Sequence, residues 1–466
     1  MNKLVKNSLP AQPRLTAKFF AERRKELFSR LPDKSVCIVV ASPERTRNND
    51  TEHPFRQSSD VLYLSGFPEP ESALVLTKFG KRQRVIMFVR PRERKAETWT
   101  GKRFGVEGAL AKFGAHEAHL TDEFATVIED LLDRAEHVYY RLGLNEEFDS
   151  QFISLLKKNQ KTLLNPCRLI HDMRRIKSQP ELDVMGYAAS VSARAHAEAM
   201  RKVRPGMYEY QLQTVVESVF GYAGAVEVAY PSIVAGGNNA NILHYTTNRE
   251  VLKDGDLVLL DAGCEFSGYA SDITRTFPVN GKFTAEQRAI YELVLKAQLA
   301  AIKACKPGRT ANQVHQICSD VLRRGLVELG ILPEEMANKR VAERLVNEAE
   351  KEKRDDKIAH LERFFMHRTG HWLGLDVHDP AGCDDSRDQP LVPGMVLTVE
   401  PGLYLPKYDR LVPPQYRGIG VRIEDDVLIT EGGCLVLSAG VPKTVDEIEV
   451  LMAEGRSSGK DPAAVL

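Results

Sequence analysis

The feature that most constrains the fold is a pattern of glycine, apolar strand, acid and glycine that occurs twice. The stretch Gly255–Gly263 has the sequence GDLVLLDAG, and Gly394–Gly402 has the sequence GMVLTVEPG. In both, an acid stands six residues after the first glycine, at the end of an apolar run typical of a buried strand. The repeat predicts two related halves, each of which delivers an acid from the end of a strand.

A second acid follows in each half. Asp272 stands eleven residues after Asp261, on a second extended run, and glycines between them allow a tight reversal. In the other half Glu424 follows Glu400 on a second extended run. Taken alone, Asp261 could be a turn residue and Asp272 a solvated surface residue. Four acids in two related halves instead predict a pseudo-two-fold site where the halves meet.

A Pro-Gly pair followed by an expected helix occurs in each half and supports the repeat. Pro205-Gly206 precedes an expected helix at 209–220, and Pro307-Gly308 precedes another at 311–329. Ser178-Gln179-Pro180-Glu181 has the capping pattern of a helix start, so we expect a long helix from Glu181 to about Val203.

The first part of the chain alternates short strands with helices, which is typical of an α/β domain. The expected strands are 36–41, 73–77, 85–89 and 137–142, and the expected helices are 15–31, 122–135 and 145–159. We predict three parts: an N-terminal domain at 1–176, a catalytic domain at 177–455 and a flexible tail at 456–466. The charged segment 333–363 is expected to be a solvated helical insertion.

Composition narrows the function classes. The chain has 64 Lys plus Arg and 64 Asp plus Glu, and this zero net charge argues against a nucleic-acid or membrane-surface binder. Its seven cysteines form no CxxC pair, so we expect reduced thiols, with no disulfide framework or zinc knuckle. No secretory signal or membrane-spanning run is evident, which favours a cytoplasmic protein.

Three histidines lie close together in the sequence MHRTGHWLGLDVHD: His367, His371 and His378. Each could be an ordinary buried histidine. With four carboxylates, however, they form an oxygen-rich set without thiolates, which suits a pair of divalent ions such as Mn²⁺, Co²⁺ or Zn²⁺ better than a structural zinc. Two carboxylates can bridge two such ions roughly 3.5–4 Å apart, with a shared hydroxide as nucleophile.

These motifs resemble a known family. HxxxHWLGLDVHD, LTVEPGLY and the hairpin between two aspartates are similar to the pita-bread metallopeptidases, and more narrowly to the aminopeptidase P (Xaa-Pro aminopeptidase) family. The stretch Phe55–Leu76, FRQSSDVLYLSGFPEPESALVL, resembles that family's N-terminal domain. The resemblance implies an α/β (α+β) chain: an N-terminal α/β domain of creatinase/prolidase type, followed by a pseudo-two-fold pita-bread catalytic domain.

The resemblance also implies residue roles. Asp261 would chelate one metal and His371 the other, while Asp272 and Glu424 bridge them. Glu400 would bind metal and act as general base. The other histidines would serve the substrate: His378 would donate to the oxyanion and help protonate the leaving proline nitrogen, His244 would contact the substrate near the scissile bond, and His367 would line the proline pocket.

Four further positions match substrate-binding residues or groups beside the ligands: Tyr230, Arg422, Arg387 and Trp99. Arg387 would face the substrate's C-terminal side, or else form a surface salt bridge. Trp99 would enter a neighbouring subunit's site, or else be a core aromatic of its own domain. The charged insertion, and a connection between Glu400 and Glu424 longer than the family's pattern, leave pocket shape open.

The implied reaction is hydrolysis of the N-terminal Xaa-Pro bond of peptides by two divalent ions, manganese foremost and zinc or cobalt as alternatives, in a homodimer or homotetramer. The main alternative is an Xaa-Pro dipeptidase (prolidase), which shares every ligand. A creatinase-like hydrolase works without metal, and a non-catalytic pita-bread binding module typically loses ligands; the complete set argues against both. Methionine aminopeptidase would not need the large N-terminal domain.

Overall fold

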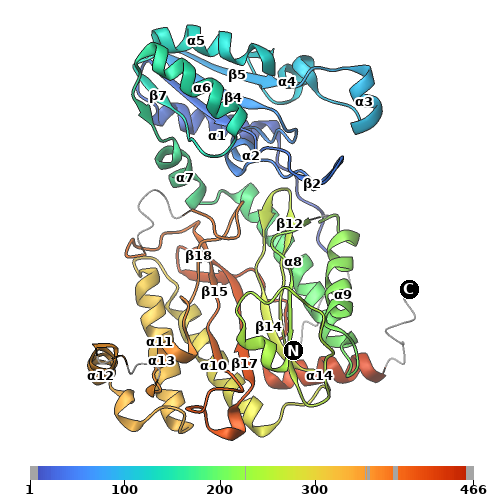
Figure 1. Ribbon diagram of the computed structural model, residues 1–466, viewed down its shortest axis with the longest axis vertical. Helices are drawn as coiled ribbons and strands as arrows, with labels where there is room; N and C mark the ends of the chain where they lie inside the picture. Colours follow the sequence, from blue (N-terminus) through green and yellow to red (C-terminus); the bar gives the residue numbers. More distant parts are fainter. Residues whose placement is uncertain (1–8, 226, 352, 354–356, 381–386, 458–466) are drawn as a thin grey trace. The chain divides into compact units, whose positions relative to one another are not determined.

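The computed structural model describes residues 9–225, 227–351, 353, 357–380 and 387–457 (Figure 1). The chain folds into two compact units, one of Arg14–Arg174 and one built chiefly from Arg175 onward. Among the described residues, no helix combines the length and the apolar character needed to span a membrane.

The Arg14–Arg174 unit is built on a six-stranded sheet of order β6-β5-β4-β1-β7-β8. The strands β1, β4 and β5 pair antiparallel, and β6, β7 and β8 add in parallel. Alternate side chains of β1 pack with phenylalanines of α5 and α6 into one core, because successive strand residues face opposite sides. The bounds of these elements are β1 Ser35–Val40, β4 Ala73–Phe79, β5 Arg82–Val89, β6 Glu117–Leu120, β7 His137–Tyr139, β8 Leu163–Leu164, α1 Ala17–Arg30, α5 Phe124–Arg134 and α6 Glu146–Asn159.

The second unit repeats one plan twice: two helices joined by a Pro-Gly turn, then a set of strands. The first pair is α8 (Gln179–Lys202) and α9 (Glu209–Tyr222), and the second is α10 (Ala285–Ala304) and α11 (Ala311–Glu328). Gly206 and Gly308 adopt φ of 91° and 83° in the two turns, which glycine adopts without strain. Glu181 accepts hydrogen bonds from the N–H and hydroxyl of Ser178, as the capping pattern predicts.

Each half then forms a hairpin that divides between two sheets. In the first half the outer strands β11 and β14 pair with each other, and the inner strands β12 and β13 form a separate short hairpin. In the second half β15 pairs with β18, and β16 pairs with β17. The bounds are β11 Leu257–Asp261, β12 Cys264–Phe266, β13 Tyr269–Ala270, β14 Thr274–Pro278, β15 Val396–Val399, β16 Gly402–Leu405, β17 Ile419–Arg422 and β18 Asp425–Thr430.

The four acids lie at the four points where the chain leaves one sheet for the other. Asp261 ends β11, Asp272 lies between β13 and β14, Glu400 between β15 and β16, and Glu424 between β17 and β18. Gly263 is required at the first crossing, because an added Cβ would lie 1.8 Å from the carbonyl oxygen of Ser271. The two halves lie side by side in Figure 1, green to yellow-green for the first and yellow through orange to red for the second.

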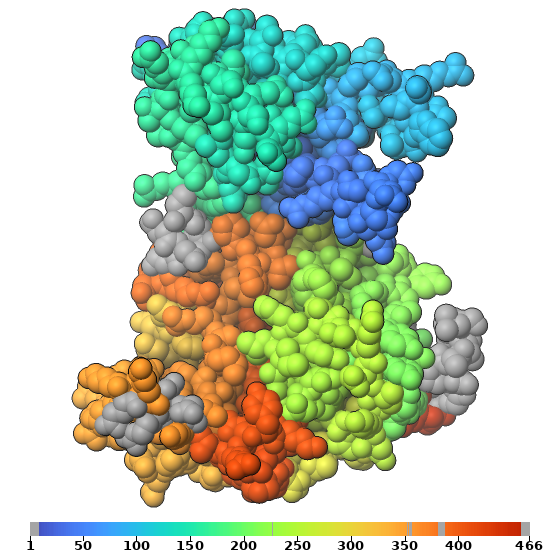
Figure 2. Space-filling model, in the orientation of Figure 1, coloured from blue at the N-terminus to red at the C-terminus, as the bar shows by residue number. Residues whose placement is uncertain are grey.

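Two predictions need correction. Asp272 is not on the second extended run; it lies two residues before β14, in the crossing itself. The predicted tail at 456–466 falls largely outside the described residues, and its described part, Arg456 and Ser457, ends helix α14 (Val445–Ser457). The charged insertion does contain a largely exposed helix, α12 (Lys339–Lys351), which lies at one edge of this unit in Figure 2.

Candidate metal centre

Tyr230 and Arg422 hold Asp261 and Asp272 in place through hydrogen bonds. The Tyr230 hydroxyl lies 2.6 Å from Asp261 Oδ1 and 2.5 Å from Asp272 Oδ1. Arg422 Nη2 donates to Asp261 Oδ2 over 2.5 Å, although it comes from the other half of the unit. Asp261 and Asp272 are 7% and 5% exposed, so these contacts hold two carboxylates close together in a setting almost without water.

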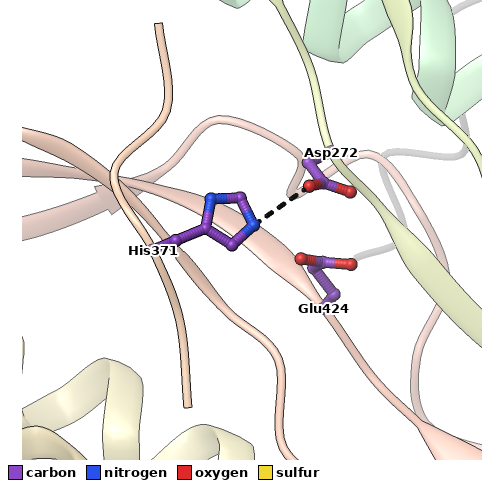
Figure 3. A group of neighbouring side chains, drawn as sticks. All are labelled: Asp272, His371 and Glu424. Atoms are coloured by element: carbon purple, nitrogen blue, oxygen red, sulfur yellow. Dashed lines mark ion pairs between the residues drawn. The ribbon is translucent and has the colours of Figure 1, made fainter. Parts of the chain in front are cut away.

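The remaining predicted ligands close the site. His371 Nε2 lies 3.3 Å from Asp272 Oδ2 and 3.5 Å from Glu400 Oε1. One ligand atom from each of Asp272, His371 and Glu424 falls within 4.8 Å of the others, and Figure 3 shows the three side chains pointing toward a common space. Thr274 donates its hydroxyl to Glu424 over 2.6 Å and so fixes that carboxylate.

Burial and mutual repulsion dominate the electrostatics of these acids. Burial, then the charge of Asp272, raises the pKa of Glu424 well above its ordinary value. Burial also raises the pKa of Glu400 to about 7. Burial by itself would lower the pKa of His371, but its hydrogen bond to Asp272 and the charge of Glu400 raise it to about 9. The protein alone therefore lacks the positive charge that this many carboxylates require.

The donor set fits divalent cations. Four carboxylates supply the oxygen ligands that hard and borderline ions prefer, and His371 adds an imidazole nitrogen. His371 Nδ1 lies 3.0 Å from the carbonyl oxygen of Trp372, which can only accept, so the Nδ1 proton is held there and Nε2 faces the acids. Cations would also relieve the repulsion that raises the pKa values of Glu400 and Glu424.

Three further predicted histidines surround the ligands. His367 lies with Nε2 2.8 Å from the Tyr404 hydroxyl and Nδ1 3.8 Å from Glu400 Oε2. The ring of His378 is centred 4.2 Å from that of His371, and the His378 side chain is exposed. His244 is also exposed, in a turn, and its charge helps lower the pKa values of His367 and His378, after burial as the main cause.

Comparisons with known proteins show the family of this chain. Residues 183–431 match the model of metallopeptidase family M24, and residues 20–139 match the aminopeptidase P N-terminal domain. The chain belongs to metallopeptidase family M24. It is 43% identical to the Xaa-Pro aminopeptidase of Haemophilus influenzae over 93% of this chain and 96% of that protein. The Xaa-Pro aminopeptidase of Escherichia coli is 42% identical, over 94% and 98% of the two chains.

Solved structures agree on the fold of this M24 member. The E. coli aminopeptidase P with the inhibitor Pro-Leu superposes with a TM-score of 0.88 at 41% identity, covering 95% of this chain and all of the other. The predicted fold class and family are therefore confirmed, as is the prediction of a hydrolase of the metallopeptidase type. The names of the relatives do not favour the dipeptidase alternative.

Two predicted substrate-binding residues of this M24 chain are Arg387, which contacts the backbone beside a ligand, and Trp99, which belongs to the other unit. Arg387 donates to the carbonyl oxygen of Gly370 over 2.7 Å, one residue before His371. Trp99 lies in the other unit, on α3 (Arg94–Thr100), with 84% of its surface exposed. The alternative that Trp99 is a core aromatic is therefore wrong, while its role toward substrate stays a prediction.

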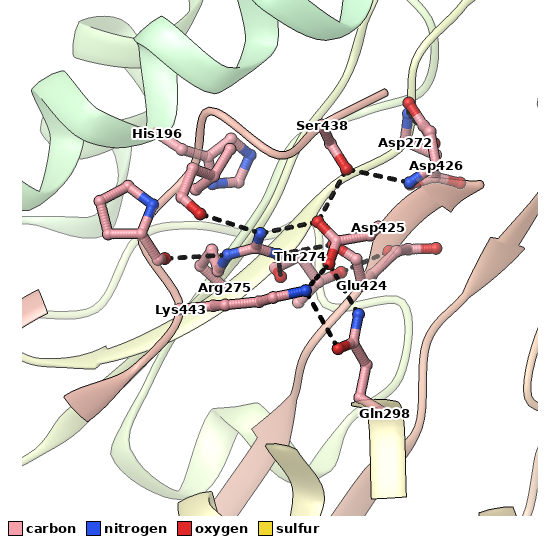
Figure 4. A network of polar contacts seen from close by, with 12 residues as sticks. His196, Asp272, Thr274, Arg275, Gln298, Glu424, Asp425, Asp426, Ser438 and Lys443 are labelled. Atoms are coloured by element: carbon pink, nitrogen blue, oxygen red, sulfur yellow. Dashed lines mark hydrogen bonds and ion pairs between the residues drawn. The ribbon is translucent and has the colours of Figure 1, made fainter. Parts of the chain in front are cut away.

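A buried ion cluster that the sequence did not predict lies next to the M24 site (Figure 4). Arg275 and Asp425, both fully buried, form an ion pair of 2.7 Å, and Lys443 Nζ lies 2.7 Å from the other Asp425 oxygen. Arg275 also donates to the carbonyl oxygen of Glu424 over 2.6 Å. The run of acids Glu424-Asp425-Asp426 was the available signal, because three consecutive acids at the start of a buried strand require partners.

Proposed function

We propose that this chain hydrolyses the N-terminal Xaa-Pro bond of peptides, as an aminopeptidase with two divalent metal ions. The observation that carries the proposal is the convergence of Asp272, His371 and Glu424 within 4.8 Å, beside Asp261 and Glu400, in a chain that resembles Xaa-Pro aminopeptidases along nearly its whole length. The resemblance supplies the proline specificity, and the donor set supplies the hydrolytic chemistry.

In this proposal each side chain has a defined role at the centre. Asp261 would hold one ion and His371 the other, Asp272 and Glu424 would contribute to both, and Glu400 would complete the set. The Tyr230 hydroxyl, which contacts both Asp261 and Asp272, fixes the angle between these carboxylates. Arg422 balances part of their charge from the opposite half.

When bound, divalent ions would polarise the scissile carbonyl and make a water molecule nucleophilic at neutral pH. Glu400 takes the proton from the attacking water as the general base, because its carboxylate belongs to the ligand cluster where that water is activated. His378 donates to the developing oxyanion. The proline nitrogen carries no hydrogen and must be protonated to leave, so the proton that Glu400 takes from the water is passed on to this nitrogen with the help of His378.

His244 and His367 complete the substrate side. His367 is fixed through Tyr404, whose hydroxyl also accepts from Arg422 Nη1 over 3.0 Å, so the proline pocket and the acid site share one hydrogen-bond chain. His244 contacts the substrate near the scissile bond from an exposed turn. Arg387 would face the C-terminal side of the peptide, where a longer substrate continues.

A paired assay tests the proposal. The protein, loaded with Mn²⁺ or Zn²⁺ in parallel, is given an Ala-Pro dipeptide and an Ala-Pro-Ala tripeptide, with Glu400→Gln as a near-isosteric control. Cleavage of the tripeptide after alanine, lost in the control, supports an Xaa-Pro aminopeptidase. Cleavage of the dipeptide alone would make the chain a prolidase and overturn the proposal, as would cleavage of neither peptide by metal-loaded protein.

Other features of the proposal have their own measurements. Metal analysis of the purified protein tests for manganese against zinc or cobalt, and light scattering tests for a homodimer or homotetramer. Trp99→Ala, on the exposed α3 helix, tests whether this residue serves a neighbouring subunit's site. Limited proteolysis near residue 176 tests the proposed domain limits, and cell fractionation tests the cytoplasmic location.

A further inference from the structure

Glu209 is a fully buried carboxylate at the first position of α9, and the proposed mechanism does not use it. Four donors converge on its two oxygens. Oε1 accepts from the backbone N–H of Gly236 over 2.9 Å and from Asn239 Nδ2 over 3.0 Å. Oε2 accepts from the Tyr245 hydroxyl over 2.8 Å and from the backbone N–H of Glu250 over 3.0 Å. The carboxylate therefore fills its hydrogen-bonding capacity with groups from a single segment.

That segment, residues 236–250, carries His244 between the anchored positions. The Tyr245 ring packs in a buried cluster with Leu259 of β11, the strand that ends at Asp261. Further along, Asn248 is held by Ser232 and Gln213. The segment also packs closely on the second half of the unit, because a Cβ on Gly420 would lie 2.7 Å from the Ala240 backbone.

The consequence for His244 is geometric. Its neighbour Tyr245 is tied to Glu209 on the inner side, while His244 itself is exposed. The ends of the segment, at Gly236 and Glu250, are tied to the same carboxylate, so the loop is closed at both ends and in its middle by one residue. Without these ties a segment of this length would sample many conformations, and a displacement of about 1 Å in a reacting group can cost about a hundredfold in rate.

We propose that Glu209 is a positioning residue, which acts through the 236–250 segment to hold His244 at the substrate side of the metal centre. The inference rests on the proposed function, because His244 matters only if it meets substrate. Glu209 itself touches neither substrate nor ligand residues; its effect on the reaction passes through His244.

Glu209→Gln tests the idea at nearly constant volume. A glutamine presents an NH₂ group on one side, so in either orientation a donor faces the N–H of Gly236 or that of Glu250. Tyr245→Phe is the milder variant, since it removes one of the four donors and keeps the buried ring. Glu181→Gln is the matched control, because Glu181 is a buried helix-start carboxylate of the same unit that bonds Ser178 and Tyr269 instead of this loop.

The decisive measurement is a double-mutant cycle on kcat/KM for Ala-Pro-Ala. Glu209→Gln is expected to lower kcat/KM about tenfold or more, Tyr245→Phe by less, and Glu181→Gln by less than twofold. In a His244→Ala background the Glu209 and Tyr245 substitutions should have almost no further effect, because the group they position is gone. Effects that simply multiply would mean a general structural role and would overturn the proposal.

A readout independent of activity separates this inference from the proposed function. Hydrogen exchange of the metal-loaded protein should show faster exchange within residues 236–250 in Glu209→Gln, with the other helices of the unit unchanged. If exchange within this segment is as slow in the variant as in wild type, Glu209 does not restrain the segment, and the inference is refuted whatever the measured activity is. A further outcome is that exchange in the loop becomes faster as expected while wild-type protein cleaves no Xaa-Pro peptide. In that case Glu209 does restrain the loop, but the proposed function and the role of His244 are both refuted.

Discussion

Replacing Glu400 with glutamine is expected to abolish hydrolysis and at the same time to stabilise the metal-free protein above neutral pH. Glu400 lies between His371 and His367 in a buried cluster of carboxylates, and burial raises its pKa from the ordinary 4.5 to about 7. A carboxyl whose pKa is higher in the folded than in the unfolded state holds its proton more tightly when folded. Folding stability therefore falls as pH rises from about 4.5 and levels off above about 7.

The size of the effect follows from the shift. A displacement from 4.5 to about 7 corresponds to about 3 kcal/mol at pH 8. The substitution also removes a stabilising effect, because the charge of Glu400 helps to raise the pKa of His371 to about 9. A histidine whose pKa is raised in the folded state stabilises the fold fully at a pH below its unfolded pKa, and this contribution is lost as the pH rises through 9. A lower pKa of His371 in the variant therefore reduces the gain in stability. The net gain expected for Glu400→Gln at pH 8 is about 1–3 kcal/mol.

Urea unfolding of chelator-treated protein, followed by tryptophan fluorescence at pH 5 and pH 8, measures this difference. The variant should be more stable than wild type at pH 8 and about equal at pH 5, with a surface substitution, Glu454→Gln, as control. Adding Mn²⁺ should reverse the order, since only wild type gains the full binding energy of the ions. A variant that is no more stable than wild type at pH 8 without metal would refute the account of the site as a cluster of repelling acids.

Three further changes test other parts of the structure. In thermal melts, Gly263→Ala should destabilise the protein by roughly 3 kcal/mol or more, because the added Cβ would clash with the Ser271 carbonyl oxygen. Gly440→Ala is the control and should be nearly neutral, because its added Cβ would contact only Ala193, at 3.5 Å. Arg422→Lys should lower kcat/KM by about 10–100-fold with little change in melting temperature, because lysine cannot contact both Asp261 and Tyr404. A kcat/KM equal to that of wild type in this variant would contradict the prediction. Dialysis against chelator should abolish peptide cleavage and divalent metal should restore it; full activity in protein shown to be metal-free would exclude a metallopeptidase mechanism.

The sequence alone leads to the proposed ligands because most of them carry a local signature. An acid at the end of an apolar strand, followed by glycine two residues later, marks Asp261 and Glu400 without any knowledge of tertiary structure. His371 is marked by its motif. These local signatures do not reveal that the strands of each hairpin belong to two different sheets. For this reason they predict Asp272 on a strand, whereas it lies in the connection between β13 and β14.

Several groups that fix the ligands could not be predicted in the same way. Thr274 donates to Glu424 from 150 residues away in sequence, and nothing distinguishes it from any other threonine in a strand. Tyr404 contacts His367 and Arg422 only because β16 and β17 pair in one register. Glu209 appears in the sequence as an ordinary acid in the first turn of a helix. These roles depend on how distant segments meet, and a local pattern contains no information on that.

The way the two halves meet explains why the site is stable despite its charge. Each half sends one arginine into the other: Arg422 of the second reaches Asp261 of the first, and Arg275 of the first reaches Asp425 of the second. All four side chains are buried, so removing one partner leaves an uncompensated charge, at a cost of about 3–5 kcal/mol. A half on its own would expose its arginine and keep its acids unpaired. The metal centre and the pairing of the halves therefore form together, and a substitution that removes the charge of either arginine should weaken both.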